Sequence, residues 1–277
     1  MMPPSRLSPV DPSETSELYI EFDGAQLVVK TDDPEARDYF RRHFLHMLVP
    51  RVTASVGDLE ILRCESGYTL RSAETRNLPR VKLESLLPLA KDEVRLQFMR
   101  SRPDLLWLHA GAVERHGTAI LLAGPSGQGK STLATLLCER GWSLLSDDIA
   151  PVRMDADEVL PFAQCPVRRI PPGREVQPNE VLALDRQPVP IDAECIRCDP
   201  VRIGGIVFLR FTHGASTELS RLTRGAAAFE MLRNATNFVD HKKEGVRRAA
   251  EMARALPAFR LIYGSPKDAV PHLDTLA

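Results

Sequence analysis

The sequence predicts an α/β protein in two parts: a small α+β module at residues 17–103 and a larger α/β domain at residues 104–277. Three observations predict this fold class. Two apolar runs of strand length flank Asp23-Gly24, a pair that supports the tight turn of a β-hairpin. A glycine-rich loop at residues 124–132 lies between an apolar run and a helical pattern. Strand-like runs and helical patterns then alternate towards residue 277, as in α/β domains.

The N-terminal part begins with residues 1–16, which are rich in Pro, Ser, Asp and Glu. Such a segment buries too little apolar surface to offset the entropy of ordering, so we expect a disordered tail. Beyond the hairpin, Asp33-Pro34 opens a helix whose apolar positions recur every three or four residues. The other elements expected here are short strands at residues 59–63, 68–71 and 81–83 and a helix at residues 92–102.

The second part begins with apolar runs of strand length at residues 105–110 and 119–123, joined by a tight turn at residues 114–117. The proline-rich stretch at residues 155–202 is expected to form loops and short strands over the site. The remaining elements are predicted as a helix at 130–140, strands at 142–145, 206–211 and 259–263, and helices at 226–232, 245–255 and 268–276.

Composition narrows the functional classes. The 36 basic and 37 acidic side chains nearly cancel, so no strong overall field favours nucleic acid or an anionic membrane as a partner. No apolar run approaches the roughly 18–20 residues that cross a bilayer, and the first residues lack a signal-peptide pattern. We therefore expect a cytoplasmic protein. Cys195 and Cys198 form one C-x-x-C pair among five cysteines. A closed zinc site needs about four ligands, so reduced thiols are the favoured interpretation.

The loop GPSGQGKST at residues 124–132 contains the pattern G-x-x-x-x-G-K-S between a strand and a helix. This pattern predicts a site for ATP and Mg²⁺. The glycines Gly124, Gly127 and Gly129 let backbone N–H groups point inward around phosphate oxygens, and the helix dipole adds positive potential. Lys130 is expected to reach the outer phosphates, and the Ser131 hydroxyl to ligate Mg²⁺. The other loop residues expected to contact the nucleotide are Ser126, Gln128 and Thr132.

Asp147 and Asp148 follow the strand that comes after this helix. A carboxylate at such a strand end is placed to help hold Mg²⁺, and a second one can accept a proton from an attacking hydroxyl. The structural alternative is a turn or helix cap made by the Asp side chains. His109 ends an earlier strand and is a candidate for the same site, although a lone histidine is more often structural. Arg168 and Arg169 are candidate phosphate contacts, against the alternative of solvated surface arginines.

Together, His109, residues 124–131 and the Asp147-Asp148 pair resemble the catalytic core of the HPr kinase/phosphorylase family. A weaker similarity to HPr-kinase-related proteins, which include peptide serine kinases of lasso-peptide systems, extends over 161–162, 166–169, 206–209, 219–228 and 259–264. The resemblance implies a P-loop kinase domain similar in fold to phosphoenolpyruvate carboxykinase. It also implies that Asp147 is the general base, that Asp148 supports Lys130 and Mg²⁺, and that His109 lines the site. The glycine-rich stretch with which carrier-protein kinases hold their partner is replaced here at residues 170–175.

The expected reaction is therefore transfer of the γ-phosphate of ATP to a serine-type hydroxyl on a protein or peptide, with Arg168 among the nucleotide contacts. Two alternatives stay open: a small-molecule acceptor such as free serine, and a nucleotide-binding sensor or assembly module that transfers nothing. The N-terminal module is the candidate for acceptor recognition or dimerisation, because it contains no catalytic pattern; a homo-oligomer is possible.

Overall fold

The computed structural model describes residues 16–51, 55–72, 80–169 and 186–276. Most of the tail predicted at residues 1–16, and the segment 170–175, lie outside these ranges. Contacts divide the chain into two compact units, one comprising Met1–Arg41 and Leu48–Phe98, the other Arg42–Met47 and Met99–Ala277. The domain boundary expected between residues 103 and 104 stays a prediction. The α/β class predicted from the sequence is confirmed.

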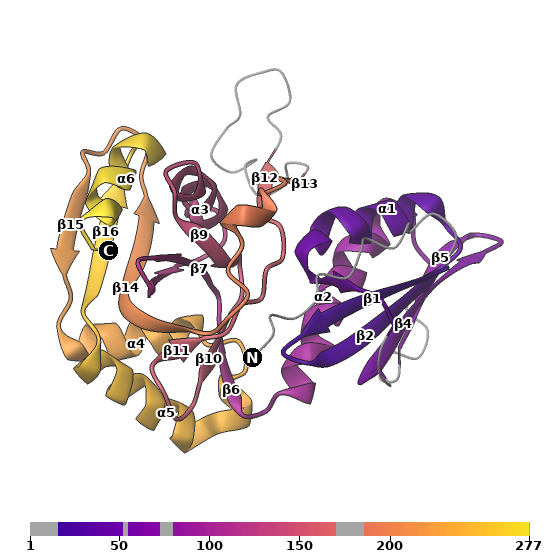
Figure 1. Cartoon of the computed structure of the whole chain (residues 1–277), viewed down its shortest axis with the longest axis horizontal. Helices are drawn as coiled ribbons and strands as arrows, with labels where there is room; N and C mark the ends of the chain where they lie inside the picture. The colour runs from indigo at the N-terminus through magenta and orange to yellow at the C-terminus, as the bar shows by residue number, and fades with distance from the viewer. Residues whose placement is uncertain (1–15, 52–54, 73–79, 170–185, 277) are drawn as a thin grey trace, which may run out of the picture. The chain divides into compact units, whose positions relative to one another are not determined.

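The first unit contains a five-stranded sheet in the order β3-β1-β2-β4-β5 (Figure 1). The hairpin of β1 and β2 turns at Asp23 and Gly24, whose φ values of 48° and 79° are both positive, as the sequence predicted. The strands are β1 (Glu17–Phe22), β2 (Ala25–Thr31), β3 (Leu48–Val49), β4 (Gly57–Cys64) and β5 (Gly67–Ser72). The helical elements at this end of the chain are α1 (Pro34–His43), the 3-10 turn η1 (Leu45–Met47) and α2 (Leu83–Ser101).

Alternation of side chains along β1 builds the core of this unit. Leu18, Ile20 and Phe22 are buried on one face of the sheet, because successive residues of a strand point to opposite faces. The Phe22 ring meets Phe98 of α2 edge to face at 5.8 Å.

Two predictions for residues 81–102 were wrong. The strand expected at residues 81–83 does not form, because Val81 makes only an isolated bridge to Tyr68 and Leu83 already belongs to α2. Helix α2 therefore begins nine residues before the predicted start. Pro88 lies inside the helix and removes one backbone hydrogen bond. The helix nevertheless continues through it, because Leu86, Ala90 and Val94 bury a continuous apolar face.

The second unit contains a nine-stranded mixed sheet whose longest strand is β14 (Val201–Phe211). β14 runs parallel to both β8 and β16. The other strands of this sheet are β6 (Leu105–Leu108), β7 (Ala110–Arg115), β8 (Thr118–Ala123), β9 (Ser143–Ser146), β10 (Ala150–Arg153), β11 (Glu158–Val159), β15 (Glu218–Arg221) and β16 (Ala258–Tyr263). A separate two-stranded ribbon pairs β12 (Val167–Arg169) with β13 (Arg186–Pro188), and the 3-10 turn η3 (Ala193–Cys195) follows.

Helices cover both faces of this sheet (Figure 1). α3 (Lys130–Cys138) and α6 (Pro266–Asp274) lie on one side, and α4 (Arg224–Asn234) and α5 (Phe238–Ala255) on the other. Each face has its own apolar core. Ile206 and Phe208 of β14 pack in the core beneath α4 and α5, whereas Val207 and Leu209 pack in the core beneath α3 and α6.

The later predicted elements are present with shifted ends. β14 begins at Val201 rather than residue 206, and α5 begins at Phe238 rather than residue 245. Lys242 interrupts α5 with φ 45° and ψ −114°, so the regular helical pattern of the sequence starts only beyond it. The described part of residues 155–202 contains short strands and loops, as expected.

Candidate active site

The glycine-rich loop predicted to bind phosphate, residues 124–129, connects β8 to α3 and is called the phosphate loop below. Its glycines adopt backbone conformations that other residues rarely take, with φ values of 152° at Gly124, 89° at Gly127 and 82° at Gly129. Gly129 is also the residue immediately before the first turn of α3. Glycine lacks the Cβ atom that makes positive φ costly, so the sequence permits this loop shape. The residues therefore fit a phosphate group held by backbone N–H donors at a helix N-terminus.

Two contacts from neighbouring strands fix the loop. The Phe211 N–H donates to Gln128 Oε1 at 2.7 Å, and Tyr263 Oη donates to the Gln128 carbonyl oxygen at 2.6 Å. A Cβ atom at Gly129 would lie 2.3 Å from Tyr263 Oη, so this position requires glycine for space as well as for φ. Burial raises the pKa of Tyr263, which keeps its hydroxyl protonated as a donor. Sequence reasoning did not find Tyr263, because it lies 135 residues from Gln128.

Lys130 is buried at the start of α3. Its Nζ atom donates to the Gly124 carbonyl oxygen at 2.7 Å and lies 2.9 Å from His109 Nε2. The same atom is 3.9 Å from Asp148 Oδ1. The structure thus brings together three predicted site residues, Lys130, His109 and Asp148, at the beginning of the loop.

The next residue, Ser131, contacts the other carboxylate. Ser131 Oγ donates to Asp147 Oδ2 at 2.9 Å, and Asp147 is only 2% exposed. A serine hydroxyl that donates its proton to a carboxylate keeps its lone pairs for a cation. The Ser131–Asp147 pair therefore fits Mg²⁺, which prefers oxygen ligands.

Asp148 has a different environment from Asp147. Its φ is 71°, in the left-handed region, so the two adjacent carboxylates turn towards different partners. The Asp148 side chain is 29% exposed, and its Oδ1 lies 3.4 Å from His109 Nδ1. A lysine ammonium can only donate, so His109 Nε2 accepts from Lys130 and its proton sits on Nδ1, facing Asp148. His109 is thus fixed between the lysine and the more accessible carboxylate.

Comparison with known proteins found partial sequence similarities to two curated proteins. No protein-family model matches the chain. Two curated relatives are both named HPr kinase/phosphorylase: one from Exiguobacterium sp., 27% identical over 88 residues, and one from Azoarcus sp., 36% identical over 75 residues. The matches cover 32% and 27% of this chain and 28% and 24% of the relatives. Over these stretches the chain is similar to members of the HPr kinase/phosphorylase family.

The matches span about a quarter of the length of these curated relatives. Among solved structures, the chain is similar to the Hpr(Ser) kinase/phosphatase from Coxiella burnetii, with a TM-score of 0.33 and 12% sequence identity. That similarity covers 61% of this chain and 92% of the solved one.

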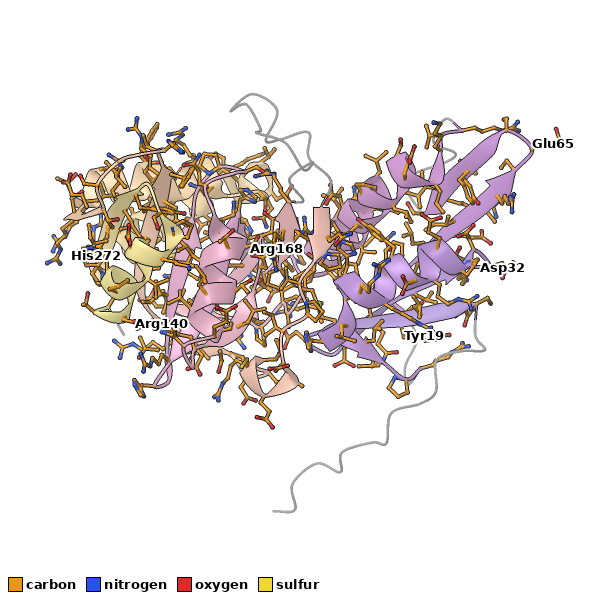
Figure 2. The ribbon with its side chains drawn as sticks, turned by 90° about the horizontal axis from the view of Figure 1, so that it is seen from above. Tyr19, Asp32, Glu65, Arg140, Arg168 and His272 are labelled. Carbon is orange, nitrogen blue, oxygen red and sulfur yellow. The ribbon has the colours of Figure 1, made fainter. Side chains whose placement is uncertain are left out.

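The two candidate arginines lie on β12, in different places. Arg168 lines a cavity of about 200 Å³ together with Ser131, Thr132 and other residues of α3, and Figure 2 shows it beside that helix. Arg169 donates through Nη2 to Ser126 Oγ in the phosphate loop at 3.2 Å. The ribbon of β12 and β13 therefore brings basic side chains to both ends of the loop.

Within the described ranges, the side chains form no cluster of three or more His, Cys, Asp or Glu that could hold a metal ion. Cys195 and Cys198 both have free thiols. None of the helices within the described ranges combines the length and apolarity needed to cross a bilayer.

Proposed function

We propose that this chain is an ATP- and Mg²⁺-dependent kinase that phosphorylates a serine-type hydroxyl on a protein or peptide. The observation that carries the proposal is the convergence of five predicted residues on one loop: Lys130 with His109 and Asp148, and Ser131 with Asp147. A site that only binds nucleotide has no need of the second, accessible carboxylate. The curated relatives named HPr kinase/phosphorylase support a kinase-like function.

The loop residues would hold the nucleotide, which supplies the γ-phosphoryl group. The backbone N–H groups of residues 124–129 and the ammonium of Lys130 would neutralise phosphate charge. Ser131 and Asp147 would hold Mg²⁺, with Asp147 fixing the direction of the serine hydroxyl.

We assign proton transfer to Asp148, and this assignment exchanges the roles that the family resemblance implies. Asp147 is buried against Ser131, whereas Asp148 is partly exposed and is oriented by His109. An entering hydroxyl needs an accessible base. In the proposed step the acceptor oxygen bonds to the γ-phosphorus, the bond from that phosphorus to the ADP oxygen breaks, and the hydroxyl proton moves to Asp148.

The experiment is incubation with γ-labelled ATP, Mg²⁺ and a pool of serine-containing peptides and small hydroxyl compounds. We expect label on an acceptor with the wild-type protein and none with Lys130→Met, which lacks the loop cation. Label on a peptide supports the proposal as stated, and label on a small compound alone would replace the peptide acceptor with a small-molecule one. ATP binding without label on any compound would contradict the kinase assignment and favour a nucleotide sensor.

A further inference from the structure

A second cavity, of about 500 Å³, opens beside the start of the phosphate loop. Its lining includes His109, Gly124 and Pro125, the residues around the Lys130 ammonium. A phosphate-loop lysine reaches the outer phosphates. This cavity therefore adjoins the end of the loop where the γ-phosphate would lie, and the smaller cavity at Thr132 adjoins the opposite end.

The wall opposite the loop is rich in arginine. Arg260 of β16 pairs in register with Phe208 of β14, and Arg210 lies two residues beyond Phe208 on the same strand face. Arg233 reaches the cavity from α4, which covers this face of the sheet. Three arginines from separate segments thus line one cavity.

A single carboxylate, that of Glu230, stands among them. It accepts from Arg260 Nη2 at 3.0 Å and from Arg233 Nη1 at 3.4 Å, and its side chain is 20% exposed. Glu230 orients two arginines and neutralises one positive charge of three, so the wall keeps an excess of positive charge. Each guanidinium has five N–H donors in a planar fork that fits a carboxylate.

The cavity is also tied to the candidate catalytic residues. The backbone N–H of His109 donates to the Asn234 carbonyl oxygen at 2.6 Å, and Asn234 Nδ2 donates to the Glu230 carbonyl oxygen at 2.8 Å. Asn234 lines the same cavity. The end of α4, which presents Glu230 and Arg233, is therefore attached to the residue that orients Asp148.

We propose that this cavity is the acceptor site and that it selects a hydroxyl acceptor carrying a carboxylate beside the hydroxyl. The inference rests on the proposed function. The cavity volume lies within the roughly 300–1,000 Å³ of pockets that bind small molecules. The carboxylate comes either from the acceptor residue itself or from a neighbouring acidic side chain, and both would meet Arg210 and Arg260.

The test uses pairs of acceptors that differ by one negative charge. N-acetylserine is compared with N-acetylserinamide, and acetyl-glutamyl-serine amide with acetyl-glutaminyl-serine amide. We expect at least a tenfold higher kcat/KM for the charged member of one pair, and the identity of that pair names the source of the carboxylate. Arg210→Gln and Arg260→Gln should remove the preference while leaving the KM for ATP unchanged.

Arg247→Gln is the matched control. Arg247 bonds Glu244 and Glu251 on the exposed face of α5, away from the cavity lining, so its loss should leave the preference intact. Equal use of charged and neutral acceptors by the wild-type protein would overturn the inference and leave the kinase assignment standing.

A binding measurement separates the two proposals. The same pairs with alanine in place of serine cannot be phosphorylated, and their affinity for the protein with Mg·ADP reports on the cavity alone. We expect the charged member of one pair to bind at least tenfold more tightly, with the difference lost in Arg260→Gln. Charge-selective binding without any phosphoryl transfer would support the carboxylate-binding cavity and contradict the proposed kinase function. Binding without charge preference would contradict the proposal that the cavity selects a carboxylate.

Discussion

Ser131 donates a hydrogen bond of 2.9 Å to Asp147, which joins the first turn of α3 to the end of β9. This contact connects the residue proposed to ligate Mg²⁺ with a buried carboxylate. Ser131→Ala removes both the hydroxyl ligand and this hydrogen bond. We expect a Mg²⁺-dependent ATP affinity lower by a factor on the order of ten, equivalent to about 1.4 kcal/mol.

The same substitution should lower the free energy of unfolding, because it removes the Ser131 hydrogen bond to the buried Asp147 carboxylate. Losing the partner of a buried polar group destabilises a fold by about 1–3 kcal/mol. ATP titrations at several Mg²⁺ concentrations and denaturant unfolding measure the two effects. Ser131→Thr keeps a hydroxyl and is the control. Wild-type Mg²⁺ dependence in Ser131→Ala would show that the hydroxyl is not a ligand.

Gly129 and Gly117 offer a matched pair of substitutions. Both have positive φ, 82° and 78°, but only a Cβ at Gly129 would meet another atom, Tyr263 Oη at 2.3 Å. Alanine at either position carries the backbone cost of about 1–2 kcal/mol. We expect Gly129→Ala to lower Tm further and to weaken ATP binding, while Gly117→Ala leaves binding unchanged. Adding Tyr263→Phe to Gly129→Ala should restore part of the ATP affinity; equal behaviour of the two alanine variants would contradict the contact.

Asp274 connects α6 to the segment between α3 and β9. The Asp274 carboxylate accepts hydrogen bonds from Trp142 Nε1 at 3.0 Å and from Arg140 Nη2 at 2.7 Å. Arg140 and His272 of α6 are labelled in Figure 2. Burial raises the pKa of Asp274, but the hydrogen bonds from Trp142 and Arg140 and the nearby positive charges outweigh it, so the net pKa is below the usual 3.8.

Because the pKa of Asp274 is lower in the folded state, its charged form stabilises the fold at neutral pH. This contribution is lost as the pH falls through the folded-state pKa. Asp274→Asn should therefore lower Tm at neutral pH, and its difference from wild type should shrink below a pH of about 4. Thermal unfolding as a function of pH measures this. A difference that stays constant down to low pH would contradict the role of the charge.

The cysteines should differ in reactivity. Burial raises the pKa of Cys138 to about 12 and that of Cys165 to about 11, whereas Cys198 is exposed. Because the thiolate is the reactive form, iodoacetamide should modify Cys198 well before the two buried thiols in the native protein. Peptide mass spectrometry over time gives the order, and the unfolded protein, in which all sites should react, is the control. Early modification of Cys138 would contradict its burial.

The sequence was sufficient to predict a glycine-rich loop followed by a helix, because Gly124, Gly127 and Gly129 permit the positive φ values found there. Its binding of phosphate stays a prediction. Asp147 and Asp148 were predicted as a pair, but their separate environments depend on φ at Asp148, which no local pattern encodes. The proposed exchange of their roles follows from burial and from contacts with residues distant in sequence.

The contacts that were not predicted come from segments far apart in the chain. Tyr263 meets the loop only because β16 pairs with β14 in parallel register. Arg210, Arg233 and Arg260 each look like surface arginines in the sequence, and they form one wall only once the sheet and α4 are assembled. Helix α2 was predicted too short, and it continues through Pro88 because its buried apolar face outweighs the lost backbone hydrogen bond.

The central claim is that the two adjacent carboxylates have separate roles in phosphoryl transfer. The most direct measurement is the transfer rate from γ-labelled ATP in Asp147→Asn and Asp148→Asn, with ATP affinity measured in parallel. We predict that Asp148→Asn binds Mg·ATP like wild type and transfers roughly 10²–10⁴-fold more slowly, the usual contribution of a general base. Asp147→Asn should instead lose Mg²⁺ affinity and regain part of its activity at high Mg²⁺. Wild-type transfer by Asp148→Asn, with activity lost in Asp147→Asn at every Mg²⁺ concentration, would contradict this assignment.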